Sequence, residues 1–102
     1  MKYVNLTPHP ITLLDGTIFP PSGKVARVTN LFTEFNEYNI CKVVYGNLID
    51  VPEPEEDTLY IVSQMVWAAT DRKDIIAPAT GHPNCKRNEK GFIEAVPGFI
   101  EH

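Results

Sequence analysis

The sequence predicts a mainly β protein with one short helix near residues 64–70. Its strands are expected to form a compact antiparallel sheet that is either a small barrel or sandwich-like. Two observations support this fold class. Short segments rich in β-branched and aromatic residues recur at intervals of about ten residues, with turn residues between them, which is typical of antiparallel β domains. The nine prolines are spread from position 8 to position 97. That spacing denies the chain a long helix.

The size and charge of the chain narrow the possibilities further. Its 102 residues suffice for one hydrophobic core, so we expect a single globular domain over residues 1–102. The formal net charge of -4 argues against non-specific binding to nucleic acid or to an anionic membrane. No apolar run approaches the roughly 18 residues of a membrane span. Residues 1–5 lack the features of a signal peptide, so we expect a cytoplasmic location.

Residues 11–19 carry the clearest local signal in the first half of the chain. Asp15-Gly16 lies between two apolar runs, which predicts a hairpin with a two-residue turn. That turn places Leu14 opposite Thr17 and Leu13 opposite Ile18. Residues 30–39 have no clean period and are expected to form an exposed loop or a hairpin tip. The other strands expected before the proline-rich acidic loop 52–57 cover residues 3–7, 24–29, 40–45 and 47–51.

The second half begins with a segment that is apolar on both faces. Residues 58–63 place Leu59 and Ile61 on one face and Tyr60 and Val62 on the other, a pattern typical of a central strand. Residues 64–70 are expected to form a short buried helix capped by Ser63, with continuation of the strand as the alternative. A loop over 79–91 and a last strand over 92–96 complete the prediction.

No arrangement of residues predicts catalysis, a metal site or a cofactor. His82 and Cys85, with Cys41 elsewhere, supply too few ligands for zinc, which takes four donors. Ser63 lacks the glycines of a nucleophile elbow, and an N-cap explains it better. No spacing supports a catalytic triad, and the standard nucleotide-binding glycine motifs are absent. We therefore expect no metal, no cofactor and no catalytic residue. We rank a hydrolase third among the functions.

Polar side chains suggest a pocket for a small anion or a nucleotide. Arg27 and Arg72 are its main candidates, because a guanidinium matches phosphate oxygens in a bidentate fashion. Both arginines could instead pair with nearby carboxylates. His9, Ser63 and Asp74 are the further candidate ligand-binding residues.

Aromatic side chains suggest a protein interface. Phe32, Phe35 and Tyr38 lie within one stretch that also contains Tyr45 and two asparagines. Exposed aromatics are the residues that most often anchor protein interfaces. The alternative is that about half of them complete a small core. The exposed edges of so small a sheet also predict a homodimer or a higher oligomer.

Several short segments together resemble a family of small bacteriophage and prophage proteins. The opening Asn5-Leu6-Thr7-Pro8-His9-Pro10-Ile11 carries most of the resemblance. It continues through Ala26-Arg27-Val28, Tyr60-Ile61-Val62-Ser63 and Arg72-x-Asp74. The resemblance implies a setting, an accessory protein in a bacterial cytoplasm, and no particular chemistry. The function expected first is therefore non-enzymatic binding of a host or phage protein through the acidic loop and the aromatic segment 32–45. The alternative is sequestration of a small anion or nucleotide by Arg27 and Arg72.

Overall fold

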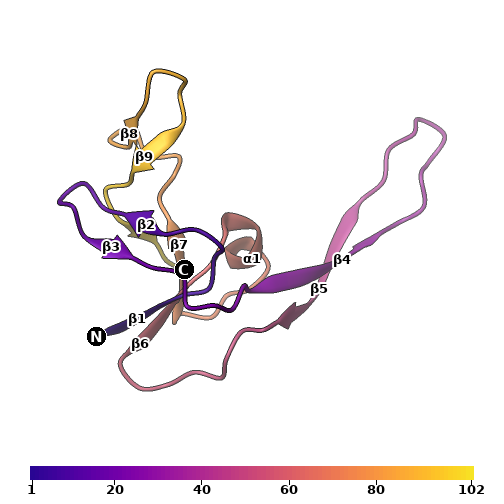
Figure 1. Ribbon diagram of the computed structural model, residues 1–102. Coiled ribbons are helices and arrows are strands. Elements are labelled where there is room, and N and C mark those ends of the chain that lie inside the picture. Colours follow the sequence, from indigo (N-terminus) through magenta and orange to yellow (C-terminus); the bar gives the residue numbers. More distant parts are fainter.

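The protein consists of short strands and a single short helix, as the computed structural model of residues 1–102 shows (Figure 1). The predicted fold class, mainly β with one short helix, is confirmed, and the strands form open sheets with no closed barrel. The helix lacks the length and apolar character that crossing a membrane requires. The elements, in chain order, are β1 (Lys2–Asn5), β2 (Ile11–Thr12), β3 (Ile18–Phe19), β4 (Arg27–Phe32), β5 (Val43–Ile49), β6 (Thr58–Ile61), α1 (Gln64–Ala68), β7 (Ile75–Pro78), β8 (Lys86–Arg87), β9 (Ile93–Ala95) and β10 (Phe99–Ile100).

The central sheet has the strand order β1-β6-β7-β10. Its first two pairings, β1 with β6 and β6 with β7, are parallel, whereas β7 and β10 are antiparallel. The expectation of antiparallel pairing therefore holds for the three two-stranded sheets and not for these two pairs. The reason is local: α1 carries the chain back across the sheet, which lets β7 run in the same direction as β6.

Each face of the central sheet packs against its own hydrophobic cluster. The alternation predicted for 58–63 is confirmed, because Tyr60 and Val62 belong to one cluster and Ile61 to the other. The first cluster also contains Val66 of α1, and Val28 and Leu48 of β4 and β5 pack against it. The second cluster is built with residues of β2 and of the segment after β9. Hairpins and one helix thus cover a single thin sheet on both sides.

The helix begins where the sequence predicts. The Ser63 side chain accepts a hydrogen bond from the backbone N–H of Val66 at 3.4 Å, so the serine is an N-cap. The helix ends at Ala68, two residues earlier than predicted. The indole ring of Trp67 in its last turn stacks on the ring of His102, with ring centroids 4.4 Å apart.

The hairpin at residues 11–19 has a different register from the predicted one. Ile11 pairs with Phe19 and Thr12 with Ile18, one position away from the expectation. The loop contains three residues, because Leu13 rather than Leu14 lies opposite Thr17. Gly16, at a φ of 94°, supplies the left-handed residue that such a loop needs.

The strand boundaries of the remaining hairpins also differ from the prediction. The strand expected at 24–29 lies at Arg27–Phe32. The two strands expected at 40–45 and 47–51 are one strand, Val43–Ile49, that runs through Gly46 with a bulge. The loop expected at 79–91 contains β8, and no sequence pattern predicts β10. Two-residue strands such as these have too little periodicity for a sequence pattern to reveal them.

Candidate protein-binding surface

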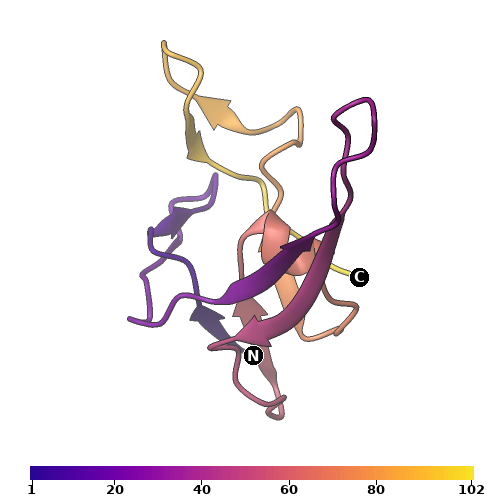
Figure 2. The same cartoon turned by 90° about the vertical axis from the view of Figure 1, so that its right-hand side faces the viewer.

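The hairpin of β4 and β5 projects from the body of the protein. We call residues 27–49 the hairpin arm. Its root crosses in front of α1 and the central sheet (Figure 2), and its far end extends into solvent at the upper right of Figure 1. The arm gives the protein a radius of gyration of 15.6 Å, whereas a compact domain of this length has about 13 Å. The arm is therefore the feature that departs most from a closed globular shape.

The register of the arm assigns its side chains to two faces. Directly opposed residues in a sheet share a face, and successive residues alternate. We call the face that begins with the core-packed pair Val28 and Leu48 the inner face. Farther out it holds the pairs Asn30–Tyr45 and Phe32–Val43. The outer face holds the pairs Arg27–Ile49 and Leu31–Val44.

A bulge lets the strand pass Gly46 without ending. Between the pairs Val28–Leu48 and Asn30–Tyr45, a single residue of β4, Thr29, lies opposite two residues of β5. A β-carbon at Gly46 would collide with the Thr29 hydroxyl. Glycine is therefore required here for space, and the bulge adds twist to the arm.

The tip of the arm is an ordered turn. Asn36 Oδ1 accepts hydrogen bonds from the backbone N–H groups of Tyr38 and Ile40, at 2.9 and 3.1 Å. Asn39 adopts a positive φ of 63° and closes the turn by donating its N–H to the Asn36 carbonyl. Because these asparagines build the turn, the aromatic side chains beside them are left facing solvent.

Exposed apolar side chains lie along the arm from its root to its tip. The predicted partner-binding residues Phe32, Phe35 and Tyr38 are 69%, 68% and 73% exposed, and none belongs to either core cluster. The alternative that they complete the core is therefore excluded for these three. The sequence analysis does not select the aliphatic residues of this surface, although the two strands of the arm carry apolar residues on both faces. They are Leu31, Ile40, Val43, Val44 and Ile49.

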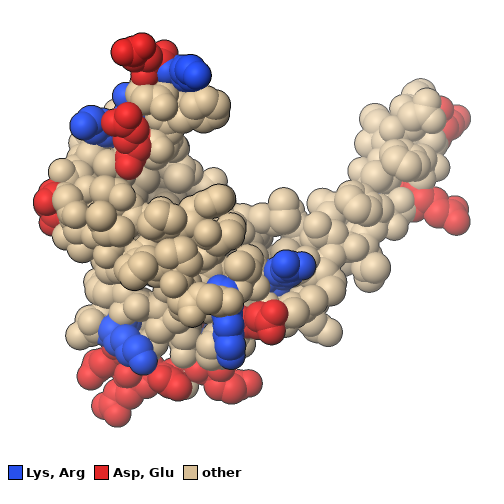
Figure 3. Space-filling model, viewed as in Figure 1, with Lys and Arg blue, Asp and Glu red and all other residues tan.

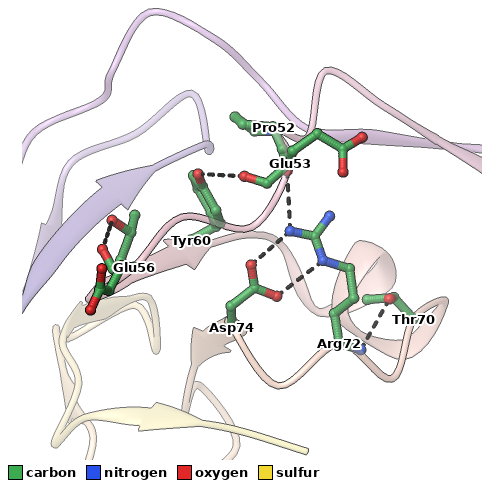
Figure 4. A network of polar contacts seen from close by, with 8 residues as sticks. Pro52, Glu53, Glu56, Tyr60, Thr70, Arg72 and Asp74 are labelled. Atoms are coloured by element: carbon green, nitrogen blue, oxygen red, sulfur yellow. Dashed lines mark hydrogen bonds and ion pairs between the residues drawn. The ribbon is translucent and has the colours of Figure 1, made fainter.

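The acidic loop lies elsewhere on the molecule. Carboxylates gather along the lower edge of the protein in Figure 3, well away from the tip of the arm. The loop is tied to the sheet, because the Tyr60 hydroxyl donates to the Glu53 carbonyl at 3.1 Å and the Thr58 hydroxyl donates to the Glu56 carbonyl at 3.1 Å (Figure 4). The acidic loop and the aromatic segment are therefore two separate surfaces.

Arg72 and Asp74, both predicted to bind a ligand, bind each other. The guanidinium donates from Nε and Nη2 to the two carboxylate oxygens, and Nη2 also donates to the Pro52 carbonyl at 3.1 Å (Figure 4). The bond to Asp74 raises the pKa of Arg72 above its usual value. This arrangement anchors the start of the acidic loop to the turn after α1.

The other predicted ligand-binding residues are not brought to one place. Arg27 is exposed on the outer face of the arm. Exposed His9 lines a shallow hollow of about 280 Å³ together with Ile11, Thr80 and others, while Ser63 caps the helix. None of the three hollows on the surface is lined by Arg27 or Arg72. The structure thus forms no shared pocket from these residues.

The motif that opens the chain forms a local network of hydrogen bonds. The Asn5 side chain is buried and donates from Nδ2 to the carbonyls of His9 and Phe19, each at 2.9 Å. Its Oδ1 accepts from both the N–H and the hydroxyl of Thr7, at 2.9 and 2.7 Å. All the hydrogen-bonding capacity of Asn5 is used inside the protein, so this motif fixes the chain around β1 rather than offering a site.

Thiols and histidines do not form a cluster. Cys85 donates its thiol to the Ala79 carbonyl at 3.0 Å, and Cys41 lies at the tip region of the arm. His82 Nδ1 accepts from the backbone N–H of Asn84. No group of three or more His, Cys, Asp or Glu side chains is placed to hold a metal ion.

Comparison with known proteins adds no relative. No family model, no curated protein and no solved structure matches the chain. The arm, with its exposed aromatic end, is accordingly the feature on which a functional assignment rests.

Proposed function

We propose that this chain is a non-enzymatic accessory protein that binds a host or phage protein through the inner face and tip of its hairpin arm. The bacteriophage or prophage setting and the bacterial cytoplasm are part of the proposal. Their support is the resemblance of residues 5–11 to small phage proteins. The observation that carries the binding role is the exposure of Phe32, Phe35 and Tyr38 at the end of the arm.

The exposed area of the arm supports a binding role. Four of its aromatic side chains, Phe32, Phe35, Tyr38 and Tyr45, are between 41% and 73% exposed. Since a large aromatic side chain has about 150–250 Å² of surface, these four expose on the order of 500 Å². The largest apolar patch on a typical monomer is about 300–600 Å² and is often functional. Aliphatic neighbours enlarge this patch further.

The order of the tip also supports binding. Asn36 and Asn39 hold the turn through backbone hydrogen bonds, so the aromatic rings sit on a defined scaffold. Binding therefore costs the arm less conformational entropy than it would cost a flexible loop. Large apolar rings on a preorganised support are the usual anchors of protein interfaces.

The test is capture of a partner by the tagged protein from infected and uninfected bacterial lysates, with mass spectrometry to identify what is captured. The double variant Phe35→Ala with Tyr38→Ala is expected to capture at least about tenfold less partner, because removing two aromatic anchors costs about 2 kcal/mol or more. Phe92→Ala is the matched control, since Phe92 is 67% exposed on a different hairpin. Circular dichroism checks that every variant is folded.

The comparison of the two variants distinguishes specific binding through the arm from non-specific capture by any exposed aromatic side chain. Loss in the double variant with retention in Phe92→Ala supports the proposal. Equal capture by the wild type and the double variant would show that the tip of the arm is not the binding surface.

A further inference from the structure

We propose that the free edge of β1 binds an extended, basic peptide segment of another protein, which joins the four-stranded central sheet as an additional strand. The site is a groove between β1 and the segment Phe19–Ser22. This inference goes beyond the proposed function, because the groove lies on the body of the protein and shares no residue with the hairpin arm.

The backbone of Tyr3 offers a donor and an acceptor at the edge of the central sheet. β1 is the first strand in the order β1-β6-β7-β10, so only one of its two sides is paired. The N–H groups of Lys2 and Leu6 both donate to carbonyls on the β6 side. Because successive residues of a strand face opposite neighbours, the N–H and the carbonyl of Tyr3 face the free edge. An extended chain lying there can exchange two hydrogen bonds with this one residue.

A groove of about 370 Å³ lies beside this edge. One wall is β1 and the other is the segment Phe19–Ser22. Ser22 closes one end of the groove, because its N–H donates to the Asn5 carbonyl at 2.9 Å. Pro20 and Pro21 have no N–H, so this stretch of the facing segment cannot donate to β1. The groove therefore stays open to a strand that the chain itself does not supply.

The peptide residue opposite Tyr3 meets an aromatic surface. Tyr3 is 42% exposed, and its ring lies against the rings of Phe19 and Phe99, with centroids 5.1 and 6.2 Å away. Directly opposed residues in neighbouring strands share a face. An apolar side chain at this position of the peptide therefore packs on the Tyr3 ring, and the site selects such a residue there.

Carboxylates near the groove favour a basic peptide. Glu55, Glu56 and Asp57 are exposed in the loop that leads into β6, and the Asp57 carbonyl accepts the N–H of Lys2 in β1. The carboxylates gather at the lower left of Figure 3, where the N-terminus lies in Figure 1. A strand added to β1 lies two strand spacings from β6, or about 10 Å. A Lys or Arg side chain spans most of that distance, and Lys2 is the single cation in the groove.

The test is a nuclear magnetic resonance titration of the isotope-labelled protein with a blocked hexapeptide of alternating valine and lysine. We expect the amide signals of β1 around Tyr3 to shift with a dissociation constant of about 1 mM or tighter, the weak range expected for so small a contact. The same peptide with every backbone nitrogen methylated cannot donate to the Tyr3 carbonyl. It is expected to bind at least about tenfold more weakly, because strand addition depends on main-chain hydrogen bonds.

Two substitutions at position 3 test the edge from the side of the protein. Tyr3→Pro removes the N–H that faces the peptide and leaves the pairing with β6, since proline is tolerated on an edge strand. It is expected to raise the dissociation constant at least about tenfold. Tyr3→Phe keeps the backbone groups and the ring, and it is expected to stay within about twofold of the wild type. If Tyr3→Pro does not fold, the methylated peptide still tests the same hydrogen bonds on the unchanged protein.

Neutralising the nearby carboxylates tests the preference for a basic peptide. Glu55→Gln with Glu56→Gln is expected to raise the dissociation constant about twofold to fivefold at low salt, because the attraction acts through solvent. Glu34→Gln with Glu37→Gln is the matched control, since it removes the same charge from exposed positions on the arm. This control is expected to leave the dissociation constant unchanged.

Four results would overturn the proposal. They are no shift in β1 at about 5 mM peptide, equal binding of the methylated peptide, equal effects of the two glutamine pairs, and β1 shifts that grow with protein concentration when no peptide is present. The last result would make a second copy of the chain the occupant. Failure of the proposed function is distinguishable, because partner capture depends on Phe35 and Tyr38, which the Tyr3→Pro variant retains.

Discussion

The carboxylate of Asp74 holds the guanidinium of Arg72 from two residues away, through bonds of 3.0 Å to Nε and 2.7 Å to Nη2. Both side chains are mostly covered, with 26% and 18% of their surface exposed. The third bond of the guanidinium, to the Pro52 carbonyl, reaches a residue twenty positions earlier in the chain. The pair therefore fastens two distant loops to each other.

Replacing Asp74 with asparagine is expected to lower the free energy of unfolding by about 1–2 kcal/mol. The substitution removes a bidentate, charge-assisted contact, and partial exposure to solvent limits the loss. Urea denaturation at pH 7 measures it. Asp71→Asn is the control, because Asp71 is an exposed acid on the same turn, and we expect a change within about 0.5 kcal/mol. Equal stability of wild type and Asp74→Asn would contradict a structural role for the pair.

Among the polar side chains, Asn5 is expected to be one whose removal lowers the free energy of unfolding most. Asn5→Ala removes four hydrogen bonds at a site that is only 2% exposed. The Phe19 carbonyl loses the bond from Asn5, and the His9 carbonyl keeps only the bond from the Thr7 hydroxyl among these side chains. We expect a loss of about 3 kcal/mol or more, measured by chemical denaturation.

The matched control is Asn88→Ala. Asn88 also accepts two backbone hydrogen bonds, from Lys90 and Phe92, but it lies in an exposed turn. We expect its loss to cost about 1 kcal/mol or less, since water replaces the bonds. Similar costs at positions 5 and 88 would mean that burial does not set the importance of Asn5.

The sequence was sufficient for those elements in which local chemistry decides the structure. The two-sided apolar pattern of residues 58–63 identified the central strand, and the hydroxyl of Ser63 identified the start of the helix. The aromatic residues at positions 32, 35 and 38 were correctly selected as surface candidates by their polar surroundings.

The rest depends on contacts that are distant in the sequence. The parallel pairing of β1 with β6 joins residues more than fifty positions apart, and no local pattern encodes it. Gly46 locally indicates a strand break, whereas the contact that requires a glycine within the strand is with Thr29, which is distant in sequence. Arg72 and Arg27 both satisfied the residue chemistry of an anion site, but the fold commits one to Asp74 and places the other on the arm.

Gly46 should tolerate alanine only when Thr29 is made smaller. A β-carbon at position 46 collides with the Thr29 hydroxyl, while the Thr29 β-carbon itself lies 3.4 Å away, at ordinary contact distance. We therefore expect Gly46→Ala alone to destabilise the protein by about 1–3 kcal/mol, as overpacking does. Adding Thr29→Ala is expected to recover most of that loss.

A double-mutant cycle measured by thermal or urea denaturation gives the coupling between these two positions. A coupling of at least about 1 kcal/mol is expected for side chains in direct contact. Additive effects of the two substitutions would show that the glycine is not needed for space at this bulge. Gly98→Ala provides a control, because a β-carbon there meets no atom within 4 Å.

Tyr60 makes the stability of the protein sensitive to alkaline pH. Burial, followed by the nearby carboxylates of Glu55 and Asp74, raises the pKa of the Tyr60 hydroxyl above its ordinary value of 10.0. Because the folded-state pKa is the higher one, the stability linked to neutral Tyr60 is fully present below pH 10 and is lost as the pH rises through the folded-state pKa.

Tyr60→Phe is therefore expected to lower stability near neutral pH and to weaken the dependence of stability on alkaline pH. Near neutral pH it should cost about 1 kcal/mol, because the hydrogen bond to the Glu53 carbonyl is removed. Above about pH 10 its free energy of unfolding should fall less steeply than that of the wild type, since the buried hydroxyl no longer ionises. Urea denaturation at a series of pH values measures both effects, with Tyr38→Phe at the exposed tip of the arm as the control. Parallel alkaline slopes for wild type and Tyr60→Phe would show that Tyr60 is not the group whose ionisation destabilises the fold.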